Sequence, residues 1–334
     1  MRCSSSIRMQ VVNRPPARAP TGPPGLTPPE DIALKAVLVA SDLSDASKKA
    51  LRHAVSVARH FDAKLYLAHV VSSVGYTIAG AEAVQLAASA ARRELDELEN
   101  KLVQGDALTG VPHEFIVRQG DVWDELRAVI QEKQADLLVL GTHARHGVAR
   151  LVMGSVAEQI FRQAGGLVLT VGPHSLPDAP PLDNAAGTLS FLFPTNFDDA
   201  SAYALPYALA FANHFKAKLA LLHVAPVMPI PEGFSWSSTP SDIIQLRADA
   251  GHTALERLRQ FVSGSSLPPV TPELMVEFGE HGETILRVAR TLKTDLVIMG
   301  LNHSKHGRAV SHLPETTAYQ VVAAAHCPVL TVRY

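Results

Sequence analysis

The stretch GTHARHGVARLVMGS, residues 141–155, combines residue types that can hold a phosphate chain. It directly follows an apolar run, and it carries basic side chains between Gly141 and a closing Gly-Ser pair. Backbone N–H groups of a glycine loop, together with the amides at a helix N-terminus, bind phosphate oxygens. The loop lacks the Gly-Lys-Ser/Thr ending of a P-loop. It therefore indicates either a phosphate site or an ordinary strand-to-helix turn.

Ser155, Arg145 and Arg150 each have two interpretations within this loop. As an N-cap, the Ser155 hydroxyl would accept a hydrogen bond from a helix amide; as a phosphate ligand, it would point outward. The two guanidinium groups would help to neutralise a triphosphate, or they are solvated loop charges. The residue types alone leave both alternatives open.

Asp42 is a second candidate, because it follows the apolar run at 36–40. A carboxylate at that place can accept hydrogen bonds from ribose hydroxyls. In an open parallel sheet, the ligand crevice lies at the carboxyl ends of the strands, where the strand order reverses. We therefore expect Asp42 and the loop at 141–155 to meet at one edge of a sheet.

Alternating apolar runs and helical patterns predict the elements that position these residues. Five strands are expected, at 36–40, 65–70, before Gly120, at 137–140 and at 167–171. Helices are expected after an N-cap at Ser44 or Asp45, and at 81–103, 124–133 and 156–163. This alternation predicts an α/β fold, a doubly wound five-stranded parallel sheet flanked by helices on both faces.

The same pattern occurs twice. Residues 35–70 align with residues 189–224 at a constant offset of 154, and Gly120 and Gly141 align with Gly279 and Gly300 at an offset of 159. Repetition at this length indicates two tandem copies of one unit. The predicted organisation is a Pro-rich disordered tail, a first domain, a linker and a second domain, at 1–31, 34–172, 173–187 and 188–334.

Composition excludes several classes of protein. The 334 residues suit two domains, and a net charge of −2 leaves no broad positive surface for nucleic acid. Two cysteines cannot form a disulfide framework, which favours the reducing cytoplasm. No apolar run reaches the length of a membrane span. The N-terminus has the basic, serine-bearing composition of a transit peptide, but its prolines oppose that alternative.

Taken together, VASDLS, LAHV, DLLVLGTHARHGVARLVMGSVAEQI and LVLTV resemble the universal stress protein family. The resemblance covers both halves of the chain and implies two doubly wound domains. ATP-binding members carry glycine, two residues, glycine, nine residues, glycine and then serine or threonine. Gly141, Gly154 and Ser155 match this pattern, whereas Ala144 replaces the second glycine. The resemblance implies ATP, with Mg²⁺, or another adenine nucleotide as the ligand.

Carried over residue by residue, the resemblance implies a nucleotide site in the first domain. Asp42 would meet the adenosine moiety, and Ala40 and Val70 would border the adenine. The phosphates would be lined by Gly141, His143, Gly154, Ser155 and Val156, and the predicted site also includes Ser41, Ala144 and Arg145.

The second domain departs from this pattern, because Asn196 replaces Asp42 and Pro314-Glu315 replaces the Gly-Ser pair. A carboxylate would repel phosphates there. We therefore predict that the second domain binds no nucleotide and serves as the partner in an intramolecular pseudodimer, in which 167–171 pairs with 328–332. A homodimer of the chain is an alternative that the sequence leaves open.

The predicted function is a stress-response regulatory protein that binds ATP. The alternative is a nucleotide-free scaffold that binds other proteins. An enzyme is not expected beyond slow, incidental ATP hydrolysis, because no set of nucleophile, base and orienting residue is present. His143 and His146 have the spacing of metal ligands, but no third ligand accompanies them, so no metal is expected. His69 and His223 are interpreted as core histidines hydrogen-bonded to the backbone.

Overall fold

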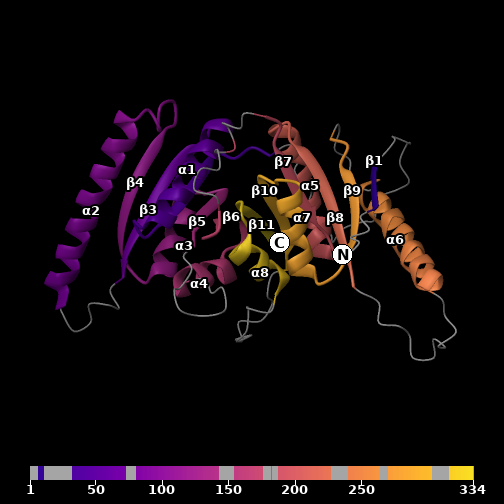
Figure 1. The fold of residues 1–334 in the computed structure, drawn as a ribbon. Helices are drawn as coiled ribbons and strands as arrows, with labels where there is room; N and C mark the ends of the chain where they lie inside the picture. The colour runs from indigo at the N-terminus through magenta and orange to yellow at the C-terminus, as the bar shows by residue number, and fades with distance from the viewer. Residues whose placement is uncertain are drawn as a thin grey trace. The chain divides into compact units, whose positions relative to one another are not determined.

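The computed structural model describes two compact units. Its described residues are 7–10, 32–72, 80–142, 154–175, 182, 187–226, 240–263, 270–302 and 316–333. The first unit contains residues 33–187 together with 322–331, and the second contains residues 1–32, 188–321 and 332–334. Figure 1 labels the helices and most of the strands of both units.

The first unit contains the five parallel strands that the sequence predicts. They are β2 (Ala36–Ser41), β3 (Lys64–Ser72), β4 (His113–Gly120), β5 (Leu137–Gly141) and β6 (Gly166–Val171). Their spatial order is β4-β3-β2-β5-β6, and the register places Val37 beside both Leu65 and Leu137. The strand order reverses at β2, so the space beyond Ser41 and Gly141 is where such a sheet leaves a crevice.

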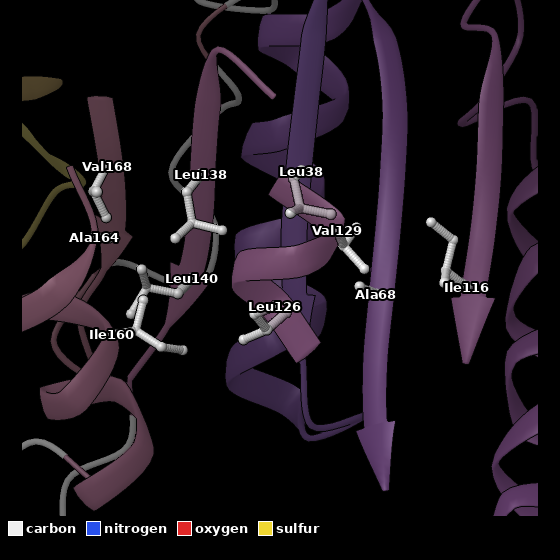
Figure 2. Close-up of a cluster of buried hydrophobic side chains, with 10 residues drawn as sticks. All are labelled: Leu38, Ala68, Ile116, Leu126, Val129, Leu138, Leu140, Ile160, Ala164 and Val168. Atoms are coloured by element: carbon white, nitrogen blue, oxygen red, sulfur yellow. The ribbon is translucent and has the colours of Figure 1, made fainter. Parts of the chain in front are cut away.

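Four helices cover this sheet: α1 (Asp45–His60), α2 (Gly80–Gln104), α3 (Val122–Lys133) and α4 (Ser155–Gln163). Helices α3 and α4 pack on one face, where Leu126, Val129 and Ile160 join Leu38 and Leu138 in a single buried cluster (Figure 2). The side chain of Ser44 accepts from the Ser47 amide and begins α1, so of the two predicted N-caps the structure selects Ser44.

The second unit repeats this arrangement. Strands β7 (Ser190–Pro194), β8 (Lys218–Ala225), β9 (Glu273–Phe278) and β10 (Leu296–Leu301) are parallel in the order β9-β8-β7-β10. Its helices are α5 (Asp199–His214), α6 (Pro240–Ser263), α7 (His281–Thr291) and α8 (Thr317–Ala324). The last strand is β11 (Val329–Arg333), whose residues up to Thr331 belong to the first unit.

A short strand near the N-terminus, β1 (Ile7–Gln10), pairs antiparallel with β9, with Ile7 opposite Val276. The sequence predicts a disordered or extended tail, and these four residues are extended and paired. The physical reason is that β9 ends the parallel order of its unit and offers an unpaired edge, while the segment IRMQ contains no proline. The other residues of the predicted tail lie outside the described ranges.

No helix among the described residues is both long enough and apolar enough to cross a bilayer.

Candidate functional site

A pocket of about 290 Å³ lies at the carboxyl ends of β2, β3 and β5, beside the first turns of α3 and α4. Its base is apolar and belongs to the buried cluster of Figure 2. Its rim carries the polar residues of the β2–α1 turn. The lining residues are Ala40, Ser41, Asp42, Ala68, His69, Val70, Val122, Leu126, Leu140, Gly141, Gly154, Val156, Ala157 and Ile160.

The structure brings together residues that are about 100 positions apart in the sequence. The predicted site residues that line this pocket are Ala40, Ser41, Asp42, Val70, Gly141, Gly154 and Val156. Ser155 is the first residue of α4, and its side chain is not described. His143, Ala144 and Arg145, as well as Arg150, lie outside the described residues.

Sequence reasoning missed the apolar wall of the pocket. Val122 and Leu126 stand one turn apart at the start of α3, and Ala157 and Ile160 stand one turn apart on α4. Their helical spacing indicates a buried face. Whether such a face is covered by other side chains or lines a pocket depends on how helix and sheet pack, which the spacing does not specify.

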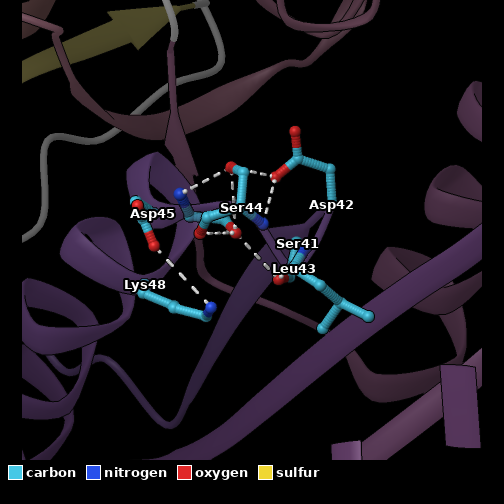
Figure 3. Close-up of polar contacts among 7 residues, drawn as sticks. Ser41, Asp42, Leu43, Ser44, Asp45 and Lys48 are labelled. Atoms are coloured by element: carbon cyan, nitrogen blue, oxygen red, sulfur yellow. Dashed lines mark hydrogen bonds and ion pairs between the residues drawn. The ribbon is translucent and has the colours of Figure 1, made fainter. Parts of the chain in front are cut away.

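Asp42 is held in a tightly hydrogen-bonded turn (Figure 3). Its Oδ1 accepts from the Ser44 amide at 3.1 Å and from the Ser44 hydroxyl. The Ser41 hydroxyl accepts from the Leu43 amide at 3.1 Å and donates to Ser47 Oγ, also at 3.1 Å. The turn presents the exposed Asp42 carboxylate at the pocket rim and places Leu43 in a left-handed conformation with φ of 65°.

His69 lies beside this turn, where it both contacts the backbone and lines the pocket. Its Nδ1 is 2.9 Å from the Ser41 carbonyl oxygen, so the predicted hydrogen bond to the backbone is confirmed. The equivalent His223 makes the same contact with the Thr195 carbonyl, also at 2.9 Å. His69 is nevertheless half-buried rather than part of the core, and it lines the pocket.

Helix α4 begins at the pocket without a side-chain cap. Its N-cap is Gly154, so the interpretation of Ser155 as the N-cap is wrong, because Ser155 already has helical backbone geometry. Glycine has no side chain to accept from the first helix amides. No side chain among the described residues caps these amides, and they point to the place where Gly154 lines the pocket, as in sites that bind an anion.

Gly141 is required by packing rather than by a ligand. A Cβ at this position would lie 2.3 Å from the Ala46 carbonyl oxygen in α1, a distance that no real contact tolerates. Gly300 has the same relation to Ala200, at 2.2 Å. In contrast, a Cβ on Gly154 would meet nothing within 4 Å. The repeated glycine thus lets the first helix of each unit lie directly on a neighbouring strand.

The second unit keeps the turn and changes its charge. Asn196 Oδ1 accepts from the Asp198 amide at 3.2 Å and from Ser201 Oγ at 2.9 Å. The turn geometry therefore survives the exchange of carboxylate for amide, while the negative charge at this position is lost. Pro314 and Glu315, which differ from the Gly-Ser pair in sequence, lie outside the described residues.

Among the described residues, no group of three or more His, Cys, Asp and Glu side chains could hold a metal ion. Within the described part of the chain, the pocket offers an apolar slot, an exposed carboxylate at its rim and a helix N-terminus without a side-chain cap. Together these groups suit a ligand with a flat apolar part, hydroxyl groups and an anionic part.

Comparison with known proteins agrees with this architecture. The Universal stress protein family profile matches residues 33–172 and again residues 190–333. The matches cover most of the chain, and the chain belongs to this family, with two of its domains in tandem.

Individual relatives match one of these domains. A universal stress protein of Methanocaldococcus jannaschii is 31% identical over 138 residues, which are 41% of this chain and 81% of the relative. A universal stress protein of Thermus aquaticus is 33% identical over 139 residues, 41% of this chain and 98% of the relative.

A solved structure matches the tandem fold. A universal stress protein from Archaeoglobus fulgidus has a TM-score of 0.61 at 15% identity, and the match covers 89% of this chain and 98% of that protein. At this identity, the likeness shows the fold alone.

Proposed function

We propose that this protein is a stress-response regulatory protein whose first unit binds ATP or another adenine nucleotide. One observation carries the proposal: Ala40, Asp42, Val70, Gly141 and Gly154, which come from four separate segments, line one pocket at the N-terminus of α4. Adenine would enter the apolar slot, and Asp42 would accept hydrogen bonds from the ribose. The phosphates would lie toward the N-terminus of α4, with Mg²⁺ as their counterion.

The proposed role is regulatory, not catalytic. The polar groups at the pocket rim are already engaged in the turn of Figure 3, where Asp42 accepts two hydrogen bonds from Ser44. Any ATP hydrolysis would be slow and incidental. The proposed location is the cytoplasm, and the proposed partners include neither nucleic acid nor a membrane.

The second unit is proposed to bind no nucleotide and to complete an intramolecular pseudodimer; a homodimer of the chain is the alternative, which the molar mass in solution tests. The observation behind the pseudodimer is that residues 322–331, although they belong to the second repeat, group with the first unit, where Thr331 Oγ1 lies 3.3 Å from the Val168 carbonyl oxygen.

The test is an isothermal titration of nucleotide-stripped protein with Mg-ATP, AMP and cAMP. One site per chain is expected. Val156 is 42% exposed at the pocket, so V156E would place a negative charge beside the phosphates and weaken binding by about tenfold or more. V103E is the matched control, because Val103 is 50% exposed on α2 and does not line the pocket.

Two sites per chain would contradict the assignment of the second unit. No heat with folded, nucleotide-free protein would favour the alternative, a scaffold that binds proteins without nucleotide. Equal weakening by V156E and V103E would place the nucleotide elsewhere.

A further inference from the structure

A second hollow of the first unit lies between the β2–α1 turn and helix α2, and it is separate from the nucleotide pocket. Its volume is about 690 Å³, within the range of small-molecule sites. We call it the α2 groove. It is lined by Leu43, Lys48, Ala90, Arg93, Glu94, Glu97, Leu98 and Lys101.

The two hollows share one turn. Asp42 lines the nucleotide pocket, while the next residue, Leu43, lines the α2 groove. Figure 3 shows their side chains pointing in different directions from the turn. The backbone between the two hollows turns at Leu43, which has a left-handed conformation with φ of 65°.

In the second unit, side chains of α6 and of the turn after β7 occupy the corresponding place. Phe197 stands at the position of Leu43, with nearly the same φ of 66°. Its ring lies 4.5 Å from the His223 ring, and the Arg257 guanidinium lies 4.5 Å from its centroid. Phe261 packs edge-on at 5.6 Å. An aromatic ring with a cation over its face therefore fits this space.

The buried residues of α2 and α6 allow the two helices to be aligned, and with them the residues around Leu43 and Phe197. Leu95 and Leu255 are 0% and 1% exposed at equivalent points of α2 and α6. In that register, Arg257 corresponds to Glu97 and Phe261 to Lys101, both of which line the α2 groove. The first unit thus has smaller or charged side chains where the second has the aromatic cluster, and the space of that cluster is open to solvent.

The charges of the groove define the ligand. Lys48, Arg93 and Lys101 contribute three positive charges, and Glu94 and Glu97 contribute two negative ones, which leaves one positive charge. Lys48 also lies 3.7 Å from Asp45, but both side chains are solvent-exposed, so water screens this pair. Such a surface favours a single negative charge and disfavours a di- or triphosphate.

We propose that the α2 groove is a binding site for a small molecule with one aromatic ring and one carboxylate. The ring lies on Leu43 and Leu98, in the position that the Phe197 ring takes in the second unit. Glu97 stands at the place of Arg257, so the cation over the ring comes instead from Lys101, one turn further along α2. The carboxylate is bound by the remaining cations. The proposal does not depend on nucleotide binding.

The test is a titration of the full chain with phenylacetate, followed by ligand-observed NMR. The expected Kd is about 1 mM or tighter for so small a ligand. Benzylamine, which has the ring and the opposite charge, and cyclohexylacetate, which has the charge without the aromatic ring, are each expected to bind at least about fivefold more weakly.

Two variants locate the site. L43F supplies the ring from the chain itself and is expected to weaken phenylacetate binding more than about tenfold. Phe197 shows that this backbone conformation accommodates phenylalanine. V156W instead obstructs the nucleotide pocket and is expected to leave phenylacetate binding unchanged. If L43F fails to fold, the exposed variant R93E replaces it, with the same expected loss.

Three results would overturn the proposal: no binding of phenylacetate at about 10 mM, undiminished binding to L43F or its replacement R93E, or loss of binding in V156W. The last result would place the probe in the nucleotide pocket. Because V156W is assayed separately with Mg-ATP, failure of the nucleotide proposal would remain distinguishable from failure of this one.

Discussion

The turn after the first strand is Ser41-Asp42-Leu43-Ser44 in the first unit and Thr195-Asn196-Phe197-Asp198 in the second. Both turns have the same hydrogen-bonding pattern and the same left-handed third residue. The two turns differ in the side chains that they carry toward the pocket and toward the long helix. The first unit has a carboxylate at the pocket rim and an open groove, whereas the second has an amide and a partly buried aromatic cluster.

This comparison separates residues that both units need for packing from residues that only the first unit has at its pocket. Gly141 and Gly300 recur because a helix carbonyl lies against each of them. The backbone contacts of His69 and His223 recur as well. Gly154, in contrast, has open space around it and lacks a matching Gly-Ser pair in the second repeat. A residue that occurs in both units therefore indicates a role in packing. The evidence for a ligand site comes from the residues that differ between the units.

The largest expected effect is on stability, from G141A and G300A. Each added Cβ would overlap a helix carbonyl oxygen, and we expect each variant to lose about 2 to 3 kcal/mol of unfolding free energy. G154A is the control, with an expected loss below about 1 kcal/mol. Urea denaturation measures all three. A G141A protein as stable as the parent would mean that Gly141 is present for a ligand.

An intermediate effect is expected for D42N, which gives the first turn the amide of the second. The turn should persist, since Asn196 makes the equivalent hydrogen bonds. Affinity for Mg-ATP should fall about tenfold, or ~1.4 kcal/mol, because a charged acceptor is lost. The converse variant, N196D, should gain no site. Calorimetric titration distinguishes these outcomes, and unchanged affinity of D42N would remove Asp42 from the site.

The smallest effect is a pH dependence confined to the second unit. Burial lowers the pKa of His223 below its usual 6.5, and the charges of Arg257 and His281 lower the pKa further, against the hydrogen bond that the ring donates to the Thr195 carbonyl, which raises it. The unfolded chain then binds more protons, so this contribution to stability is complete above about pH 6.5 and is lost as the pH falls through the folded pKa.

Replacing His223 by glutamine should flatten the loss of stability between about pH 7 and pH 5. The exposed His252→Gln is the control and should leave the profile unchanged. Denaturation midpoints measured across this range test the prediction. The same slope in H223Q and in the parent protein would contradict it.

Much of this protein follows from the sequence alone. The alternation of apolar runs and helical patterns predicted both doubly wound units, and the observed strands lie within two residues of the ranges expected in the first unit. Asp42 and the Gly-Ser pair could be found because strand ends in a parallel sheet converge. These features depend on local periodicity and chain order, which the sequence contains directly.

Other features were decided only by the tertiary structure. The role of Gly141 depends on how closely α1 approaches β5, and the apolar wall at Val122 and Ile160 depends on where α3 and α4 lie on the sheet. The α2 groove depends on how α2 lies against the turn at Leu43, whose counterpart in the second unit is Phe197 in a similar conformation. Each of these depends on distances between segments far apart in the chain, and local sequence patterns carry no information about such distances.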